Sequence, residues 1–145
     1  MSYESYLLVL LIICTHVSIV DFIHRKIHNH TLWMLLFFQY FLSPLDIQLT
    51  TFLVVLVGGL ILYAFIWVGA GDIKYAAVLS LTIPLQDLLW SLVMMAFVGG
   101  FLAIAYLVNR KLVTNTANTR EGIPYGIAIS VGFYLVILTQ NTPHI

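Results

Sequence analysis

Long apolar runs separated by short polar segments dominate the pattern of this chain. The runs cover residues 5–20, 31–42, 49–68, 73–85, 88–108 and 123–138. A helix rises about 1.5 Å per residue, so about 20 apolar residues cross the roughly 30 Å hydrocarbon core of a membrane. Runs two and four are shorter, so either they begin below the membrane surface or their flanks complete the span. The pattern predicts an all-α, polytopic integral membrane protein with about six transmembrane helices.

Composition agrees with the membrane assignment. The chain is 61% hydrophobic and 8% charged, whereas a soluble domain carries about 25% charged residues. Its 145 residues suit a single membrane-embedded domain spanning residues 1–145. The only cysteine, Cys14, lies within an apolar run and is interpreted as a small packing residue. A single cysteine excludes a disulfide framework, and no basic patch is large enough for nucleic acid.

The cations are distributed unevenly along the predicted topology. With six helices, the segments after the first, third and fifth runs share one side of the membrane. These segments contain Arg25, Lys26, Lys74, Arg110, Lys111 and Arg120, which are all the Lys and Arg residues of the chain. The opposite side carries Glu4, Asp46 and Asp87. Because cations concentrate in cytoplasmic loops, we expect both termini outside the cytoplasm and the basic loops inside it.

Two aspartates lie at the cytoplasmic ends of apolar runs. Asp21 follows the first run, and Asp72 ends the sequence Gly-Ala-Gly-Asp at 69–72. An ionisable residue costs roughly 2.5–3.5 kcal/mol at the bilayer centre, so a carboxylate beside such a run indicates function. Residue counting places Asp21 and Asp72 at a similar depth near the same boundary.

Two carboxylates in one poorly hydrated site share a proton. The ionised member can activate water while the protonated member donates to a carbonyl oxygen, as in aspartic proteases. Gly69 and Gly71 allow backbone conformations and a close approach that side chains would block. Asp72 would lie at the positive end of a helix dipole, and Lys74 would extend to water or lipid phosphate. A single aspartate near a helix end is more commonly a helix cap or an interfacial charge, so the hypothesis rests on the pair.

Three segments together resemble the type IV prepilin peptidase family, which are polytopic aspartic proteases with a GxGD motif. The segments are Asp21, Gly69-Ala70-Gly71-Asp72-Ile73-Lys74, and Gly122-Ile123-Pro124-Tyr125-Gly126. The size of the chain resembles the small peptidases of Tad/Flp pilus systems. The resemblance implies cleavage of a basic leader from a prepilin or pseudopilin at the cytoplasmic face of the bacterial inner membrane. It also implies that Asp21 and Asp72 are the catalytic residues.

The same resemblance sets further expectations for the site. Pro124, Tyr125 and Gly126 are candidates for lining it, although packing explains Tyr125 equally well. Larger members of the family carry a cytoplasmic loop with paired CxxC motifs and N-methylate the new terminus. This chain has one cysteine and no such loop, so we expect neither methylation nor its zinc, and no cofactor.

The substrate's mode of docking is less constrained. The leader and the cytoplasmic loops are both basic, so their mutual attraction cannot hold the substrate. We expect Glu121 or the apolar helix of the substrate to supply the affinity, with membrane lipid as the surrounding partner.

The histidines suggest a competing interpretation as a metal site. His24 and His28 are four residues apart, with His30 nearby, and Asp21 could join them around zinc. The chain lacks an HExxH helix, so we expect no metal. His16, midway along the first run, is expected to be buried and neutral.

Two other classes of function remain open from the sequence. In a small transporter or proton-conducting protein, the aspartates would bind a proton or a cation near the membrane midplane. In a non-catalytic assembly subunit of a pilus or secretion machine, the aspartates would not need to approach each other.

Overall fold

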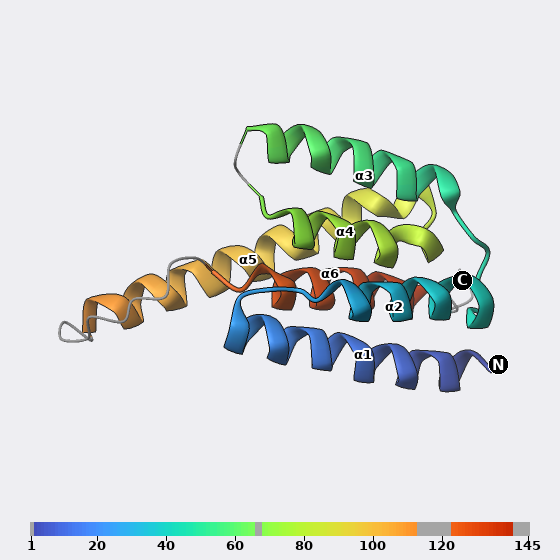
Figure 1. Cartoon of the computed structure of the whole chain (residues 1–145), viewed down its shortest axis with the longest axis horizontal. Helices are drawn as coiled ribbons and strands as arrows, with labels where there is room; N and C mark the ends of the chain where they lie inside the picture. Colours follow the sequence, from blue (N-terminus) through green and yellow to red (C-terminus); the bar gives the residue numbers. More distant parts are fainter. Residues whose placement is uncertain (1, 66–67, 113–122, 141–145) are drawn as a thin grey trace.

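The computed structural model describes residues 2–65, 68–112 and 123–140. The elements are α1 (Tyr3–His24), α2 (Asn29–Leu42), α3 (Leu49–Ala64), α4 (Ala70–Leu79), the 3₁₀ helix η1 (Ser80–Thr82), α5 (Leu85–Leu112) and α6 (Tyr125–Thr139). These three ranges contain no β-strand. The predicted all-α class is therefore confirmed, and each predicted run corresponds to one helix (Figure 1).

The helices differ in their ability to cross a membrane. Within the described ranges, α1 and α5 are long and apolar enough for a full span, while α3 and α6 are shorter apolar helices. α2 has 14 residues and α4 has 10, which gives lengths of about 21 and 15 Å. The six-span topology and the position of the termini therefore stay predictions. Figure 1 shows the N-terminus and the end of α6 at the same end of the bundle.

Several helix boundaries differ from those predicted. α1 continues to His24, so Asp21 lies within its last turn rather than after it. α3 ends at Ala64 and α4 begins at Ala70, earlier than the apolar pattern suggested. α5 extends to Leu112 and includes Arg110 and Lys111, which were expected in a loop. Basic side chains in a last turn interact favourably with the helix dipole, and polar residues there do not end a helix.

The described charges segregate between the two ends of the bundle. Arg25, Lys26, Lys74, Arg110 and Lys111 belong to the end of α1, the loop after it, the start of α4 and the end of α5. Figure 1 shows these parts of the chain toward the same end. Glu4, Asp46 and Asp87 belong to the start of α1, the segment between α2 and α3 and the start of α5, and Figure 1 shows these parts toward the other end. Arg120 lies outside the described residues.

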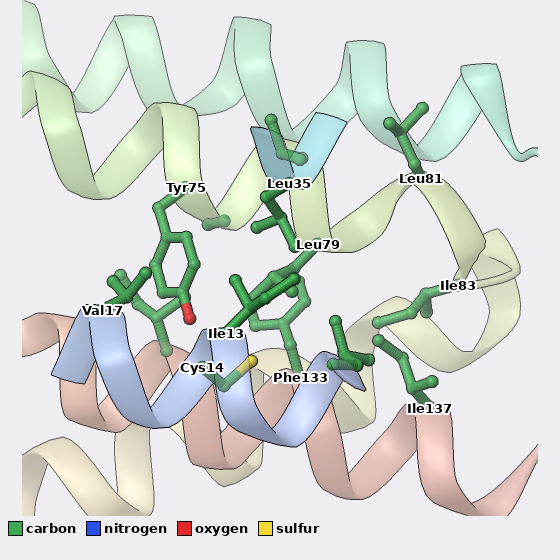
Figure 2. Close-up of a cluster of buried hydrophobic side chains, with 14 of the residues drawn as sticks. Ile13, Cys14, Val17, Leu35, Tyr75, Leu79, Leu81, Ile83, Phe133 and Ile137 are labelled. Atoms are coloured by element: carbon green, nitrogen blue, oxygen red, sulfur yellow. The ribbon is translucent and has the colours of Figure 1, made fainter. Parts of the chain in front are cut away.

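The core lies between α1, α2, α4 and α6 (Figure 2). Tyr75 and Leu79 of α4 and Phe133 of α6 are fully buried there, and Cys14 packs among them as predicted. α4 is short but central, because five consecutive residues from Tyr75 to Leu79 are all buried. By contrast, Thr51 is the only buried residue of α3. α3 is thus a peripheral helix beside a central α4.

One expectation about the first helix is wrong. His16 is exposed on the outer surface of α1 rather than buried. The packed face of α1 follows Leu10, Ile13 and Val17, and His16 lies off this face.

Candidate active site

Asp21 occupies the last turn of α1 and is held by the start of α6. Its side chain is only 5% exposed. The backbone N–H of Gly126 donates a hydrogen bond to Asp21 Oδ2 at 2.8 Å. A Cβ atom at position 126 would lie 2.7 Å from the same oxygen. Gly126 is therefore required for close approach of α6 to this carboxylate, and the segment that opens α6 positions Asp21.

Asp72 lies in the first turn of α4 and is half-buried. Gly69 is the N-cap residue of this helix, with φ −71° and ψ 143°. A Cβ on Gly69 would lie 3.2 Å from Asp72 Oδ2, whereas one on Gly71 would make an ordinary 3.5 Å contact with Ile27. Neither glycine has a left-handed backbone. The prediction that both glycines adopt a backbone conformation closed to other residues is therefore wrong. Gly69 instead leaves space for the close approach of the Asp72 carboxylate.

The two aspartates line one cavity of about 330 Å³. The other described residues that line it are Arg25, Lys26, Ile27, Gly69, Gly71 and Ile123. The structure therefore brings together, from α1 and α4, the two carboxylates that the sequence singled out 51 positions apart.

Arg25 also lines the cavity, although the sequence indicated it only as a cation that sets the membrane orientation. It is the C-cap of α1 in a left-handed conformation with φ 56°, and its N–H donates to the carbonyl oxygen of Asp21. Its guanidinium donates to the hydroxyl of Tyr106 at 2.8 Å and lies 5.2 Å from that ring's centroid. The end of α1 is thereby linked to α5. The sequence feature that indicates a site role for Arg25 is its position one helical turn after Asp21.

A hydrogen-bonded group behind Asp21 joins three helices. The Tyr75 hydroxyl of α4 and Ser130 Oγ of α6 are 2.7 Å apart, and Ser130 donates to the Gly126 carbonyl at 2.7 Å. Ser18 Oγ of α1 lies 3.0 Å from Ser130 Oγ. The group therefore supports the residue whose N–H contacts Asp21. In the sequence, this group is indicated by serines within apolar runs, because serine side chains form hydrogen bonds between membrane helices.

The other candidate residues lie away from the cavity. Lys74 is exposed and lines a different cavity, with Asn29 and Trp33. Tyr125 packs beside α5, where a Cβ on Gly99 would lie 3.4 Å from its ring. Neither Tyr125 nor the buried Pro124 lines the cavity of the aspartates. Gly122 and Glu121 lie outside the described residues.

The histidines do not converge with the aspartates. The rings of His24 and His28 are 6.3 Å apart in an edge-to-face arrangement, and both side chains are exposed. Among the residues that the structure describes, no three His, Cys, Asp or Glu side chains lie close enough to hold a metal ion.

The described chain forms an apolar helical bundle with two carboxylates in one cavity at one end. This arrangement is the one expected of a membrane enzyme. A family model described as the type IV leader peptidase family matches residues 8–107. The chain belongs to this peptidase family. The matched region includes Asp21, Asp72 and the glycines before it, but not α6. Neither the curated proteins nor the solved structures contain a match to the chain. Membership and the apolar helices together indicate a membrane protein with a leader-peptidase type of function.

Proposed function

We propose that the protein is a membrane aspartic endopeptidase that removes the basic leader from prepilin-like proteins. The observation that carries this proposal is the placement of Asp21 and Asp72 in one cavity. The proposed site faces the cytoplasm at the inner membrane of a bacterium, because the described cations lie at the same end of the bundle. Substrates of this kind, prepilins or pseudopilins, place a polar leader beside an apolar helix at the membrane boundary.

The proposed reaction uses the two carboxylates as an acid and a base. The ionised aspartate removes a proton from water, whose oxygen attacks the carbonyl carbon of the scissile peptide bond. The protonated aspartate donates to the carbonyl oxygen, which gives a tetrahedral intermediate with two hydroxyl groups. The proton taken from water then passes to the amide nitrogen, the C–N bond breaks, and one hydroxyl returns its proton to the second aspartate, which leaves a carboxyl group and a free amine. The Gly126 N–H fixes the orientation of Asp21. Because the pair titrates jointly, the roles of acid and base belong to the pair rather than to one residue.

The position of the cavity favours hydrolysis over transport. A carboxylate that carries a proton or cation across a membrane belongs near the midplane, within reach of both sides. Asp21 lies in the last turn of α1, and Asp72 lies in the first turn of α4. Both helix ends lie at the same end of the bundle (Figure 1). The proposed activity needs no cofactor and includes no N-methylation.

The proposal is tested with purified protein in liposomes and a panel of synthetic precursors. Each precursor carries a lysine-containing leader followed by about 20 apolar residues, which is the length of a membrane span. We expect the wild-type protein to release the leader at a single bond, identified by mass spectrometry, and Asp72→Asn to release none. Uncut precursors throughout the panel, or equal cleavage by Asp72→Asn, would contradict the proposal.

A further inference from the structure

A second cavity, of about 310 Å³, lies beside the first and is apolar. Its walls come from α3, α4, α5 and α6, and include Gly58, Leu62, Leu92, Met95 and Ile129. We refer to it as the α3–α5 groove. Asp72 is the one charged or polar residue among the described residues that line it. Gly58, Leu62 and Leu92 are exposed, so the groove can be entered from the outer surface of the bundle.

Asp72 connects the groove to the cavity of the aspartates, because it lines both. On one side of Asp72 are Asp21, Arg25 and Lys26. On the other side, every other described residue that lines the groove is apolar. A peptide whose carbonyl group lies at Asp72 would therefore have one flank in a polar environment and the other in an apolar one. This arrangement matches a chain that changes from polar to apolar at the bond that is cut.

We propose that the α3–α5 groove binds the first apolar side chains that follow the scissile bond of the substrate. This inference rests on the proposed peptidase function and adds the site that determines substrate choice. A cavity of about 150 Å³ holds one benzene molecule, so the groove accommodates about two large apolar side chains. Arg25 and Lys26 offset the negative charges of Asp21 and Asp72 in the polar cavity, so we assign the main part of the affinity to the apolar side of the substrate.

Gly58 offers a way to fill the groove without disturbing the bundle. A Cβ atom built on Gly58 meets no atom within 4 Å, whereas one on the neighbouring Gly59 would collide with the side chain of Ile73. Val55 and Leu62, one turn away on either side of Gly58, also line the groove. Residues three and four apart share a helix face, so a side chain at position 58 extends into the groove.

Gly100 provides a matched control for Gly58. It is also an exposed helical glycine, a Cβ on it meets no atom within 4 Å, and it does not line the groove. Leucine at either position removes a glycine from a helix and adds the same side chain. Only leucine at position 58 occupies the groove.

The test compares Gly58→Leu with Gly100→Leu on two precursors. One precursor has a lysine-containing leader and an apolar segment of about 20 residues, the length of a span; the other keeps the leader and the cut bond but replaces the apolar segment with polar residues. We expect Gly58→Leu to raise KM for the apolar precursor by at least about tenfold, the lower end of discrimination in hydrophobic pockets. Its effect on the polar precursor should be smaller, and Gly100→Leu should match the wild type.

The outcomes separate this inference from the proposed function. If the wild-type protein cuts no precursor, the proposed function fails. If it cuts them and Gly58→Leu behaves like Gly100→Leu, the proposed peptidase function stands and the groove proposal is wrong. The same result is expected if lipid alone occupies the groove.

A second readout does not require turnover. In an Asp72→Asn, Cys14→Ala background, cysteine at position 58 but not at position 100 should cross-link to a cysteine just after the scissile bond. Equal cross-linking at both positions, or at neither, would contradict the proposal.

Discussion

The two aspartates of the cavity are held in different ways. Asp21 is buried, lies in a helix of 22 residues and accepts a hydrogen bond from Gly126. Asp72 is half-buried, begins a helix of 10 residues and has no side-chain hydrogen bond within the described part of the chain. Asp21 is thus a fixed reference point, whereas Asp72 has room to adjust at the junction of the two cavities.

This difference follows from how each flank of the site is packed. Ser130 supports the α1–α6 side of the cavity through buried hydrogen bonds to the Gly126 carbonyl and to the Tyr75 hydroxyl of α4. On the other flank, α3 packs mainly on α4 and contributes only Thr51 to the buried residues. We therefore expect activity to be more sensitive to changes around Asp21 than to equivalent changes around Asp72.

The largest effect among the glycine variants is expected for Gly126→Ala. The new methyl group would lie 2.7 Å from Asp21 Oδ2, so the carboxylate must move. A shift of about 1 Å in a catalytic group can lower the rate by about 10²-fold. The methyl group would also lie 2.9 Å from Cγ and 3.0 Å from Cβ of Asp21, so α6 must shift as well, and the thermal stability should fall along with the cleavage rate. A rate within twofold of the wild type would show that the position of Asp21 is not critical.

A smaller effect is expected for Gly69→Ala, with Gly71→Ala as its matched control. A Cβ on Gly69 would lie 3.2 Å from Asp72 Oδ2, which requires a shift of a few tenths of an ångström. A Cβ on Gly71 would make an ordinary contact with Ile27. The cleavage rate should therefore fall more for Gly69→Ala than for Gly71→Ala, and less for both than for Gly126→Ala. The reverse order in parallel rate measurements would refute the proposed difference in rigidity.

The smallest effect is expected for Tyr75→Phe. This change removes the buried hydrogen bond to Ser130 while leaving the ring in the core (Figure 2). The net loss for such a bond is about 0.5–1.5 kcal/mol, measured as earlier thermal unfolding in detergent. Tyr63→Phe on the exposed surface of α3 is the control, and it should leave the unfolding temperature unchanged. Equal unfolding temperatures for the two variants would remove the support assigned to Ser130.

Much of this arrangement is predictable from the sequence because apolar runs and charges follow simple rules. The runs correspond to the six α-helices of the described residues, and the two aspartates beside them line one cavity. Gly126 was predicted to line the site only because its segment resembles the prepilin peptidase family. Of the three candidates Pro124, Tyr125 and Gly126, it is the one that contacts Asp21.

The rest depends on tertiary packing, which apolar patterns do not encode. The rotation of α1 in the bundle exposes His16 and buries Asp21. Lys74 is only two residues from Asp72, yet it lies against another cavity because neighbouring residues point to different sides of a helix. The α3–α5 groove arises from the loose contact between α3 and α5, and no residue type in α3 indicates it.

The central claim is that Asp21 and Asp72 form one catalytic pair, and leader cleavage by single variants tests it most directly. Initial rates should be measured for the wild type, Asp21→Asn, Asp72→Asn and Asp87→Asn at equal amounts of folded protein. Loss of a general acid or base typically costs about 10²–10⁴-fold, so each of the first two variants should lose at least about 10²-fold. Asp87→Asn, at the opposite end of the bundle, should retain the wild-type rate. Cleavage at the wild-type rate by either Asp21→Asn or Asp72→Asn would contradict the account.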